Sequence, residues 1–289
     1  MSALWRIAAG GTTRLAVGPV ETGPQRCLDH DLSLADVLAG TPPLDDAVAT
    51  AAEGEPVPED ARLLAPIEDQ EVWAAGVTYL RSRDARMEES DTPDFYSLVY
   101  GADRPELFFK STGERVRGPG APIGVRADSQ WDVPEPELAV VADTRGRIVA
   151  YTIGNDVSSR SIEGENPLYL PQAKTYAGSC ALGPCLVTSD AAGALASLQI
   201  SVSIERGDET QYADSVSAAQ LKREPQELVD WLFRAMDFPR GVVLLTGTAL
   251  VPGSDTSLEP GDLVRIHIAG LGELVNPVER VGRGKEERP

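Results

Sequence analysis

The chain contains only three cysteines, two histidines and four lysines among its 289 residues, and it has no long run of apolar residues. Cys27, Cys180 and Cys185 match the spacing of neither a zinc site nor a disulfide framework, so we expect free thiols in a reducing compartment. Without an apolar stretch of about 20 residues, no transmembrane helix is expected. The opening segment MSALWRIAAGG also lacks the apolar core and charge order of a signal peptide. These absences predict a cytoplasmic protein that does not enter a membrane.

Positive charge is also scarce, because 45 acidic residues stand against 26 basic ones and give a formal net charge of −19. Such a field repels phosphate groups, so we expect no nucleic-acid partner and no anionic membrane surface. Lysine occurs only at Lys110, Lys174, Lys222 and Lys285, and arginine supplies the other 22 basic residues. An acidic, lysine-poor surface suits a high-salt cytoplasm, but a GC-rich genome also favours arginine, and both explanations stay open. An anionic substrate would need a local positive site, which a metal ion can supply.

The length and composition suit a small unit followed by a larger domain. Hydrophobic residues make up 42 % of the chain, which is enough to fill a core. Residues 1–65 form the expected small N-terminal domain, within which residues 40–60, rich in Ala, Pro, Glu and Asp, should run over the surface. Pro66 marks the expected boundary. The second domain then covers residues 66–289, with about its last 8 residues disordered.

Short apolar stretches that end at Gly or Pro recur along the chain and predict a mostly β protein, a roll or barrel. A helix is expected at Glu224–Met236, because Pro225 suits a first turn and the apolar residues fall on one helical face. A helical turn is expected at Ser33–Leu38, with Ser33 as its N-cap. The expected strands before residue 111 are Leu4–Ile7, Thr13–Val17, Glu71–Val77 and Pro105–Lys110.

The most informative stretch is Glu135-Pro136-Glu137, which leads into the apolar run Leu138–Val141. In an extended chain residues i and i+2 point to the same face, so both carboxylates project together. A turn at Asp143–Gly146 and a strand over Ile148–Ile153 then bring Asn155-Asp156 to the same end of the hairpin. Three neighbouring carboxylates repel one another unless a cation lies between them. An all-oxygen set suits a hard ion such as Mg²⁺, Mn²⁺ or Ca²⁺.

The same motif could instead line a solvated face of a strand, and that interpretation stays open at this point. Two features favour a ligand site. Pro134 and Pro136 each remove a ladder hydrogen bond, which is typical of a strand edge or of a bend at a site. The run Leu138–Val141 is apolar on both faces, so the strand enters a core with its acidic end at the rim.

Further motifs follow the Glu-x-Glu strand in order: Asn155–Arg160, Lys174, Gly183-Pro184, Leu245–Thr248, Leu258–Asp262 and Asn276–Val278. Together they resemble the fumarylacetoacetate hydrolase superfamily over roughly residues 70–280. The resemblance implies an α+β, predominantly β fold, namely a β-roll with flanking helices behind a small N-terminal domain. It also implies a homodimer or homotetramer. By the same resemblance Glu135, Glu137 and Asp156 would be the metal ligands, with Mg²⁺ expected and Mn²⁺ or Ca²⁺ acceptable.

Family members that hydrolyse C–C bonds carry the pattern Gly-Leu-Asn-Tyr-x-x-His-x-x-Glu at a lid, and its His–Glu pair activates water. The matching run here is Gly76–Ala85, with Ser82 in place of the His and Ala85 in place of the Glu. Neither of the two histidines lies near this run in the sequence. Unless a shifted alignment lets Glu88 or Glu89 serve, hydrolysis is disfavoured.

The runs GVTYLRSRDAR, RPELFFK and VPEPELAVV resemble instead the branch that dehydrates 2-keto-3-deoxy-D-arabinonate. The resemblance implies metal-dependent dehydration of that sugar acid, or a related pentonate, to 2,5-dioxopentanoate in pentose oxidation. The ion would bind the C1 carboxylate and C2 keto oxygens and acidify the C3 protons. Lys174 is a candidate base, because an ammonium near a dication shifts toward its neutral form, and Glu106 could protonate the departing hydroxyl. Which of the two is the base stays open.

Other contacts to the small-molecule 2-oxo sugar acid are less specified by the sequence. By resemblance Thr248 would offer its hydroxyl to the substrate carboxylate, and Arg81, Ser82 and Arg83 are candidates for the sugar hydroxyls. These residues could equally be turn and surface positions. Two other functions stay open: a hydrolase or decarboxylase of an acylpyruvate-like diketo acid, and a protein that binds 2-oxo acids without turnover. The sequence does not fix the epimer at C4.

Overall fold

The computed structural model describes residues 1–50, 54–81, 93–194 and 197–283. Its strands form three sheets. The first sheet has ten strands: β1 (Ser2–Ala9), β2 (Thr12–Pro19), β3 (Arg26–Cys27), β4 (Arg62–Leu63), β5 (Glu71–Gly76), β6 (Glu106–Ser111), β9 (Pro136–Ala142), β10 (Ile148–Asp156), β12 (Cys180–Thr188) and β15 (Val242–Leu245). The second has five: β7 (Ile123–Arg126), β13 (Gln199–Arg206), β14 (Glu209–Ser217), β16 (Leu263–Ile268) and β17 (Gly272–Val281). The third pairs β8 (Asp132–Val133) with β11 (Ser158–Ser159).

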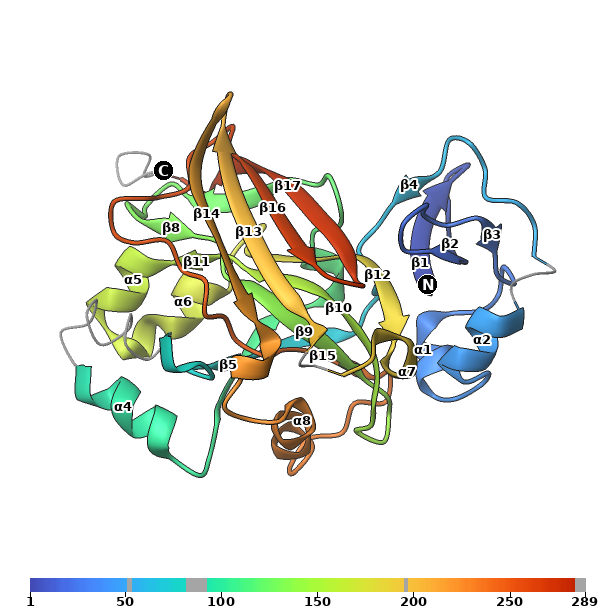
Figure 1. Ribbon diagram of the computed structural model, residues 1–289, viewed down its shortest axis with the longest axis horizontal. Helices are drawn as coiled ribbons and strands as arrows, with labels where there is room; N and C mark the ends of the chain where they lie inside the picture. The colour runs from blue at the N-terminus through green and yellow to red at the C-terminus, as the bar shows by residue number, and fades with distance from the viewer. Residues whose placement is uncertain (51–53, 82–92, 195–196, 284–289) are drawn as a thin grey trace.

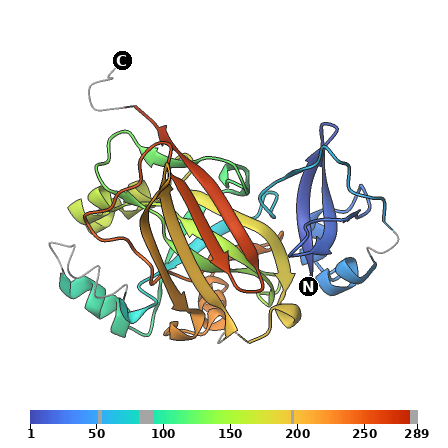
Figure 2. The same ribbon diagram turned by 45° about the horizontal axis from the view of Figure 1, so that its top comes forward.

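The two large sheets pack on each other, with β13, β14, β16 and β17 crossing over the strands of the first sheet (Figures 1 and 2). The first sheet has the order β3-β2-β1-β12-β10-β9-β15-β5-β6, with β4 beside β1, and the second has β14-β13-β16-β17-β7. One buried apolar cluster contains residues of both sheets, among them Leu138, Ile153, Val202, Ile204 and Ile266. Burial of such a cluster between two sheets stabilises the roll. The predicted α+β, predominantly β fold is confirmed.

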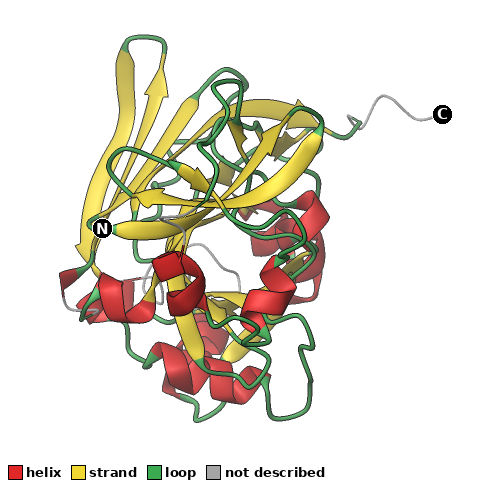
Figure 3. Cartoon of the chain, turned by 90° about the vertical axis from the view of Figure 1, so that its right-hand side faces the viewer, coloured by secondary structure: helices red, strands yellow, loops and turns green. Residues whose placement is uncertain are grey.

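Helices are short and lie mainly around one side of the strands (Figure 3). The α-helices are α1 (Leu34–Leu38), α2 (Leu44–Thr50), α4 (Pro93–Gly101), α5 (Arg160–Glu165), α6 (Leu170–Lys174), α7 (Ser189–Ala192) and α8 (Pro225–Leu232). Single 3₁₀ turns occur at η2 (Gly113–Arg115), η3 (Pro167–Tyr169) and η5 (Ala218–Gln220). None of the helices in the described residues is long and apolar enough to cross a membrane.

The predicted hairpin is confirmed at the centre of the first sheet. Strand β9 is buried along its whole length and pairs antiparallel with β10, with Glu137 opposite Gly154. Asp143 closes the turn, because its carboxylate accepts hydrogen bonds from the Arg145 and Arg147 amides, both at 2.9 Å. Strand β10 continues past the predicted end at Ile153 as far as Asp156, since its last residues also pair with β12. The acidic ends of both strands therefore meet at one edge of the core.

Helix α8 is shorter than predicted. It begins at Pro225 as expected, and it packs three buried residues, Leu228, Val229 and Leu232, against β9 and β15. It ends at Leu232 instead of Met236, because the Phe233 and Arg234 amides bond to Val229 and Trp231 in a tightening last turn.

Within residues 1–50 and 54–65, a hairpin and two helices pack beside the roll (Figure 1). Ser33 caps α1 as predicted, and Asp36 completes a capping box by accepting from the Ser33 amide. The described residues between 40 and 60 are mostly exposed, as expected for a segment that runs over the surface, but α2 forms there and buries Leu44 and Ala47. Strand β1 also pairs with β12, so this segment extends the first sheet. The division at residue 66 into two domains stays a prediction.

Candidate active site

The predicted carboxylates meet at the end of the central hairpin. Glu135 directly precedes β9, Glu137 lies in β9 and Asp156 ends β10; all three are buried, and their ligand oxygens lie within 4.8 Å of one another. The hairpin register is extended here by the Asp156 amide, which donates to the Glu135 carbonyl at 2.9 Å. The alternative of a solvated acidic face is therefore wrong for these residues.

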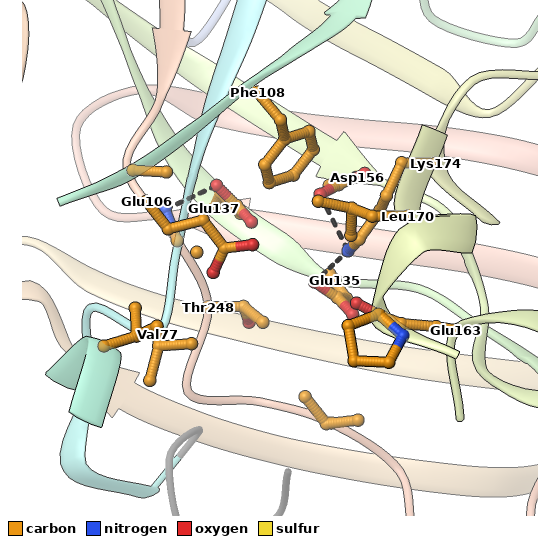
Figure 4. A pocket seen from close by; sticks show the side chains of 16 residues that line it. Val77, Glu106, Phe108, Glu135, Glu137, Asp156, Glu163, Leu170, Lys174 and Thr248 are labelled. Carbon is orange, nitrogen blue, oxygen red and sulfur yellow. Dashed lines mark hydrogen bonds and ion pairs between the residues drawn. The ribbon is translucent and has the colours of Figure 1, made fainter. Parts of the chain in front are cut away.

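Lys174, the last residue of α6, reaches this cluster from the side. Its Nζ contacts Glu135 Oε2 at 2.9 Å, Asp156 Oδ2 at 3.0 Å and Ser158 Oγ at 2.6 Å. The side chain is only 3 % exposed. We call Glu135, Glu137, Asp156 and Lys174 the floor of the pocket (Figure 4).

Burial and charge act differently on two of the floor carboxyls. Burial raises the pKa of Glu137 well above its ordinary value, and the negative charges of Asp156 and Glu135 raise it further. Burial would also raise the pKa of Asp156, but the ammonium groups of Lys110 and Lys174 outweigh burial and lower it. A cation among the three carboxylates would remove the repulsion that Glu137 experiences. The donor set is entirely oxygen, so the residues fit a hard divalent ion such as Mg²⁺ or Mn²⁺.

A loop after β15 completes the cluster. The Gly247 amide donates to Glu137 Oε2 at 2.6 Å and so orients that carboxylate. Gly247 has φ +96°, and a Cβ there would lie 1.9 Å from the Thr78 hydroxyl, so the loop requires glycine. Thr248 follows in the pocket wall, where its hydroxyl accepts from the Leu250 amide at 3.0 Å.

The pocket above the floor has a cavity of about 160 Å³. Glu106, at the start of β6, lines it beside Gly76; a Cβ on Gly76 would lie 2.2 Å from the Glu106 carboxylate, so glycine leaves room for that acid. Figure 4 shows Glu106 and Glu163 on opposite sides of the pocket. We call the outer lining residues the rim of the pocket: Val77, Val99, Glu163, Pro167, Leu170 and Val251.

The structure brings together six of the nine site residues that the sequence predicts. Glu106, Glu135, Glu137, Asp156, Lys174 and Thr248 all line the one pocket. Arg81 does not line it, and instead pairs with Asp214 of β14 at 2.5 Å. Ser82 and Arg83 lie outside the described residues, as do Ala85, Glu88 and Glu89.

Both histidines of the chain are remote from the pocket lining. His30 is exposed beside Asp31, and His267 is exposed on β16. Neither is among the residues that line the pocket. The site therefore has no imidazole for a His–Glu pair.

Sequence reasoning missed several groups around the floor. Lys110 is fully buried and pairs with Asp156, and Arg160 lies 3.8 Å from Glu135 and 3.6 Å from Glu163. Glu163 itself lines the pocket. Two signals were available: Lys110 is one of only four lysines and occurs in a largely apolar strand, and Arg160 falls inside a motif that was already singled out.

The fold and the floor together define a class of protein, a β-roll with an all-oxygen cation site at the end of its central hairpin. The family model described as "Fumarylacetoacetate (FAA) hydrolase C-terminal" matches residues 71–279. The chain therefore belongs to the fumarylacetoacetate hydrolase family.

Two relatives and one solved structure show which members of this family the chain is similar to. A "Probable 2-keto-3-deoxyxylonate dehydratase" of Haloferax volcanii is 49 % identical over 255 residues, which is 87 % of this chain and 88 % of the relative. A "2-dehydro-3-deoxy-D-arabinonate dehydratase" of Saccharolobus solfataricus is 45 % identical over 225 residues, 76 % of each chain. A structure titled "2-keto-3-deoxy-D-arabinonate dehydratase complexed with magnesium and 2,5-dioxopentanoate" has a TM-score of 0.83 and 35 % identity, and the match covers 98 % of this chain and 100 % of that one.

Proposed function

We propose that this protein is a metal-dependent hydro-lyase that converts 2-keto-3-deoxy-D-arabinonate, or a related pentonate, to 2,5-dioxopentanoate in pentose oxidation. The observation that carries the proposal is the floor itself: three buried carboxylates with one lysine bonded across two of them, and no histidine at the pocket. The two dehydratase relatives at 49 % and 45 % identity support the same reaction class. A third support is the similarity of this chain to the solved dehydratase structure whose title names magnesium and 2,5-dioxopentanoate.

Glu135, Glu137 and Asp156 would hold the divalent cation, which we propose to be Mg²⁺, with Mn²⁺ or Ca²⁺ able to substitute. When bound, such an ion supplies Lewis-acid polarisation of the substrate's C1 carboxylate and C2 keto oxygens and so acidifies the C3 protons. The Gly247 amide fixes the Glu137 carboxylate, and burial of the floor excludes bulk water from it.

Proton transfer is assigned to the two groups that flank the reacting carbons. Lys174 Nζ, in its neutral form beside the bound cation, takes a proton from C3, and the C4–O bond breaks as Glu106, in its acid form, gives a proton to the departing hydroxyl, which leaves as water. A proton then leaves C5 and another is added at C3, which gives a C4–C5 enol, and transfer of the C5 hydroxyl proton to C4 converts that enol into the aldehyde. The balance is loss of one water with no oxidant or reductant. Thr248 is proposed to donate its hydroxyl to the substrate carboxylate, whereas Arg81, Ser82 and Arg83 remain proposals for hydroxyl contacts.

The setting of the reaction is also proposed. Three free buried cysteines fit a reducing cytoplasm. We propose a homodimer or homotetramer, and a catalytic domain over residues 66–289 behind a small domain over residues 1–65. Size-exclusion chromatography with light scattering tests the assembly state.

The first experiment is an assay of purified protein with 2-keto-3-deoxy-D-arabinonate and Mg²⁺, in which the aldehyde product is followed with and without EDTA. We expect aldehyde formation that EDTA abolishes and that excess Mg²⁺ restores. Acylpyruvate is the comparison substrate. Pyruvate release from it, with no aldehyde from the sugar acid, would overturn the dehydratase proposal in favour of a hydrolase.

A further inference from the structure

Lys110 is the most deeply buried charged group near the floor. It lies in β6, its side chain is 0 % exposed, and it does not line the pocket. Its Nζ contacts Asp156 Oδ1 and donates to two backbone carbonyls, those of Val157 at 3.1 Å and Lys174 at 2.5 Å. One ammonium group thus connects β6 with the end of β10 and with the end of α6.

The two oxygens of Asp156 are divided between two lysines. Oδ2 contacts Lys174 Nζ at 3.0 Å, and because that same Nζ contacts Glu135, Oδ2 lies on the side of the carboxylate cluster. Oδ1 contacts Lys110, which is not among the residues that line the pocket. Oδ2 is therefore the Asp156 oxygen on the side of the carboxylate cluster, and a cation there would share it with Lys174.

We infer that Lys110 is a positioning residue that keeps Asp156 a one-oxygen ligand and thereby makes the site select Mg²⁺ over Ca²⁺. Mg²⁺ requires near-ideal octahedral geometry at about 2.0–2.1 Å, which single carboxylate oxygens provide. Ca²⁺ accepts six to eight oxygens at longer distances and readily takes both oxygens of one carboxylate. Pinning Oδ1 removes this second oxygen from the larger ion.

The contact with the Lys174 carbonyl adds a second effect. It fixes the end of α6, from which the Lys174 side chain extends to Glu135 and Asp156. Lys110 therefore fixes the metal ligand Asp156 and the proposed base Lys174 relative to each other. This inference rests on the cation site of the proposed function, but it does not depend on which substrate is dehydrated.

The test is calorimetric titration of metal-stripped protein with Mg²⁺ and with Ca²⁺, comparing the wild type with Lys110→Met. Removing a positive charge strengthens attraction for both ions, so the readout is the ratio of the two affinities. We expect the Mg²⁺/Ca²⁺ affinity ratio to fall by about ten-fold or more, a typical size for removing a partner of a metal ligand. Lys222→Met, which removes an exposed lysine, is the control and should leave the ratio unchanged.

An unchanged ratio in Lys110→Met, or equal weakening of both ions, overturns the inference and leaves Lys110 a structural residue. If that variant fails to fold, crystal structures of the wild type with Mg²⁺ and with Ca²⁺ decide the question. A single Asp156 oxygen on the ion, with Lys110 still on the other, supports it, and two Asp156 oxygens on the ion refute it. Absence of dehydratase activity with normal Mg²⁺ selectivity would contradict the proposed reaction alone.

Discussion

The floor and the rim of the pocket are built in different ways. The floor carboxylates lie in or directly beside the ends of the two central strands of a ten-stranded sheet, and Lys174 and the Gly247 amide bond directly to them. The rim comes from α4, from α5 through α6, and from loops, and its lining is mostly apolar side chains. Large apolar side chains are exposed next to it, with Leu168 at 84 % and Leu98 at 68 %. We infer that the floor carries the proposed chemistry, whereas the rim sets which substrate fits.

The backbone at the junction of the two regions supports this division. Val77, the rim residue directly after β5, has φ 53°, a left-handed conformation that a β-branched residue rarely adopts. Strain of this kind persists where the surrounding structure fixes it, often at functional sites. Strand β5 thus ends at the pocket, and the surrounding packing holds Val77 in the conformation with which the chain leaves the sheet.

The largest expected effect comes from breaking the floor with Glu137→Gln. The substitution keeps the shape but removes one of three carboxylates, so the site should lose Mg²⁺ affinity. Aldehyde formation should fall by about a thousand-fold or more, because a Lewis-acid ion contributes several kcal/mol to the transition state. Calorimetry and the aldehyde assay measure both. Glu259→Gln, at an acid that pairs with Arg206 away from the pocket, is the control and should keep full activity.

Lys174→Met should lower kcat by about 100-fold to 10,000-fold, the usual contribution of a general base. The cation site itself should survive, because Lys174 contacts its carboxylates without being a ligand. Steady-state kinetics and Mg²⁺ titration of the same preparation separate the two effects. Normal turnover in the Lys174→Met variant would mean that Glu106 is the base. If neither the wild type nor the variant turns the substrate over while both retain ligand affinity, a binding protein would instead be favoured.

Much of the floor could be predicted from the sequence, because its geometry follows from local rules. Glu135 and Glu137 share a face by strand alternation, and a short turn returns the chain to place Asp156 beside them. The Ser33 cap is local in the same sense. Such features need only a few residues of context.

The rest depends on pairings between distant parts of the chain. Lys110 meets Asp156 only because β6 packs against α6 at the end of β10, and Arg81 meets Asp214 across 133 positions. The rim depends on where α5 and η3 pack, and their short sequences have no periodicity that would predict it. Residue types and spacing do not encode these contacts, so they required the structure.

Asp132, a buried acid outside the pocket, differs from the floor carboxylate Asp156 in its charged partners. Asp132 of β8 is 3 % exposed, and burial raises its pKa from 3.8 to about 6, partly offset by hydrogen bonds from Ser129 and Arg126. Among the residues that the structure describes, no lysine pairs with Asp132, whereas two pair with Asp156. Between about pH 4 and pH 6 the folded protein keeps a proton that the unfolded chain releases, so Asp132 lowers stability as pH rises through that window.

Asp132→Asn should therefore stabilise the protein above pH 6 by up to about 3 kcal/mol, since each pKa unit corresponds to about 1.36 kcal/mol. The difference from the wild type should vanish below about pH 4. Urea unfolding at pH 4, 5 and 7.5 measures it. Asp208→Asn in the exposed β13–β14 turn controls for loss of charge alone. A constant difference at all three pH values would show that packing, and not ionisation, is responsible.

The smallest expected effect is at the rim, with Glu163→Gln. Glu163 lines the pocket from α5, its side chain is 7 % exposed, and Arg160 lies 3.6 Å away. A carboxylate there can accept a hydrogen bond from a substrate hydroxyl, and loss of its charge weakens such a bond by enough to raise KM about ten-fold. Because Glu163 does not touch the floor cation site in our proposal, kcat should change little.

A dicarboxylate such as 2-oxoglutarate should inhibit the Glu163→Gln variant more strongly than the wild type, since one repelling charge is gone. Glu165→Gln, on the exposed side of the same helix, is the matched control. A fall in kcat with an unchanged KM would place Glu163 among the reacting groups, and the division between a catalytic floor and a selective rim would then fail.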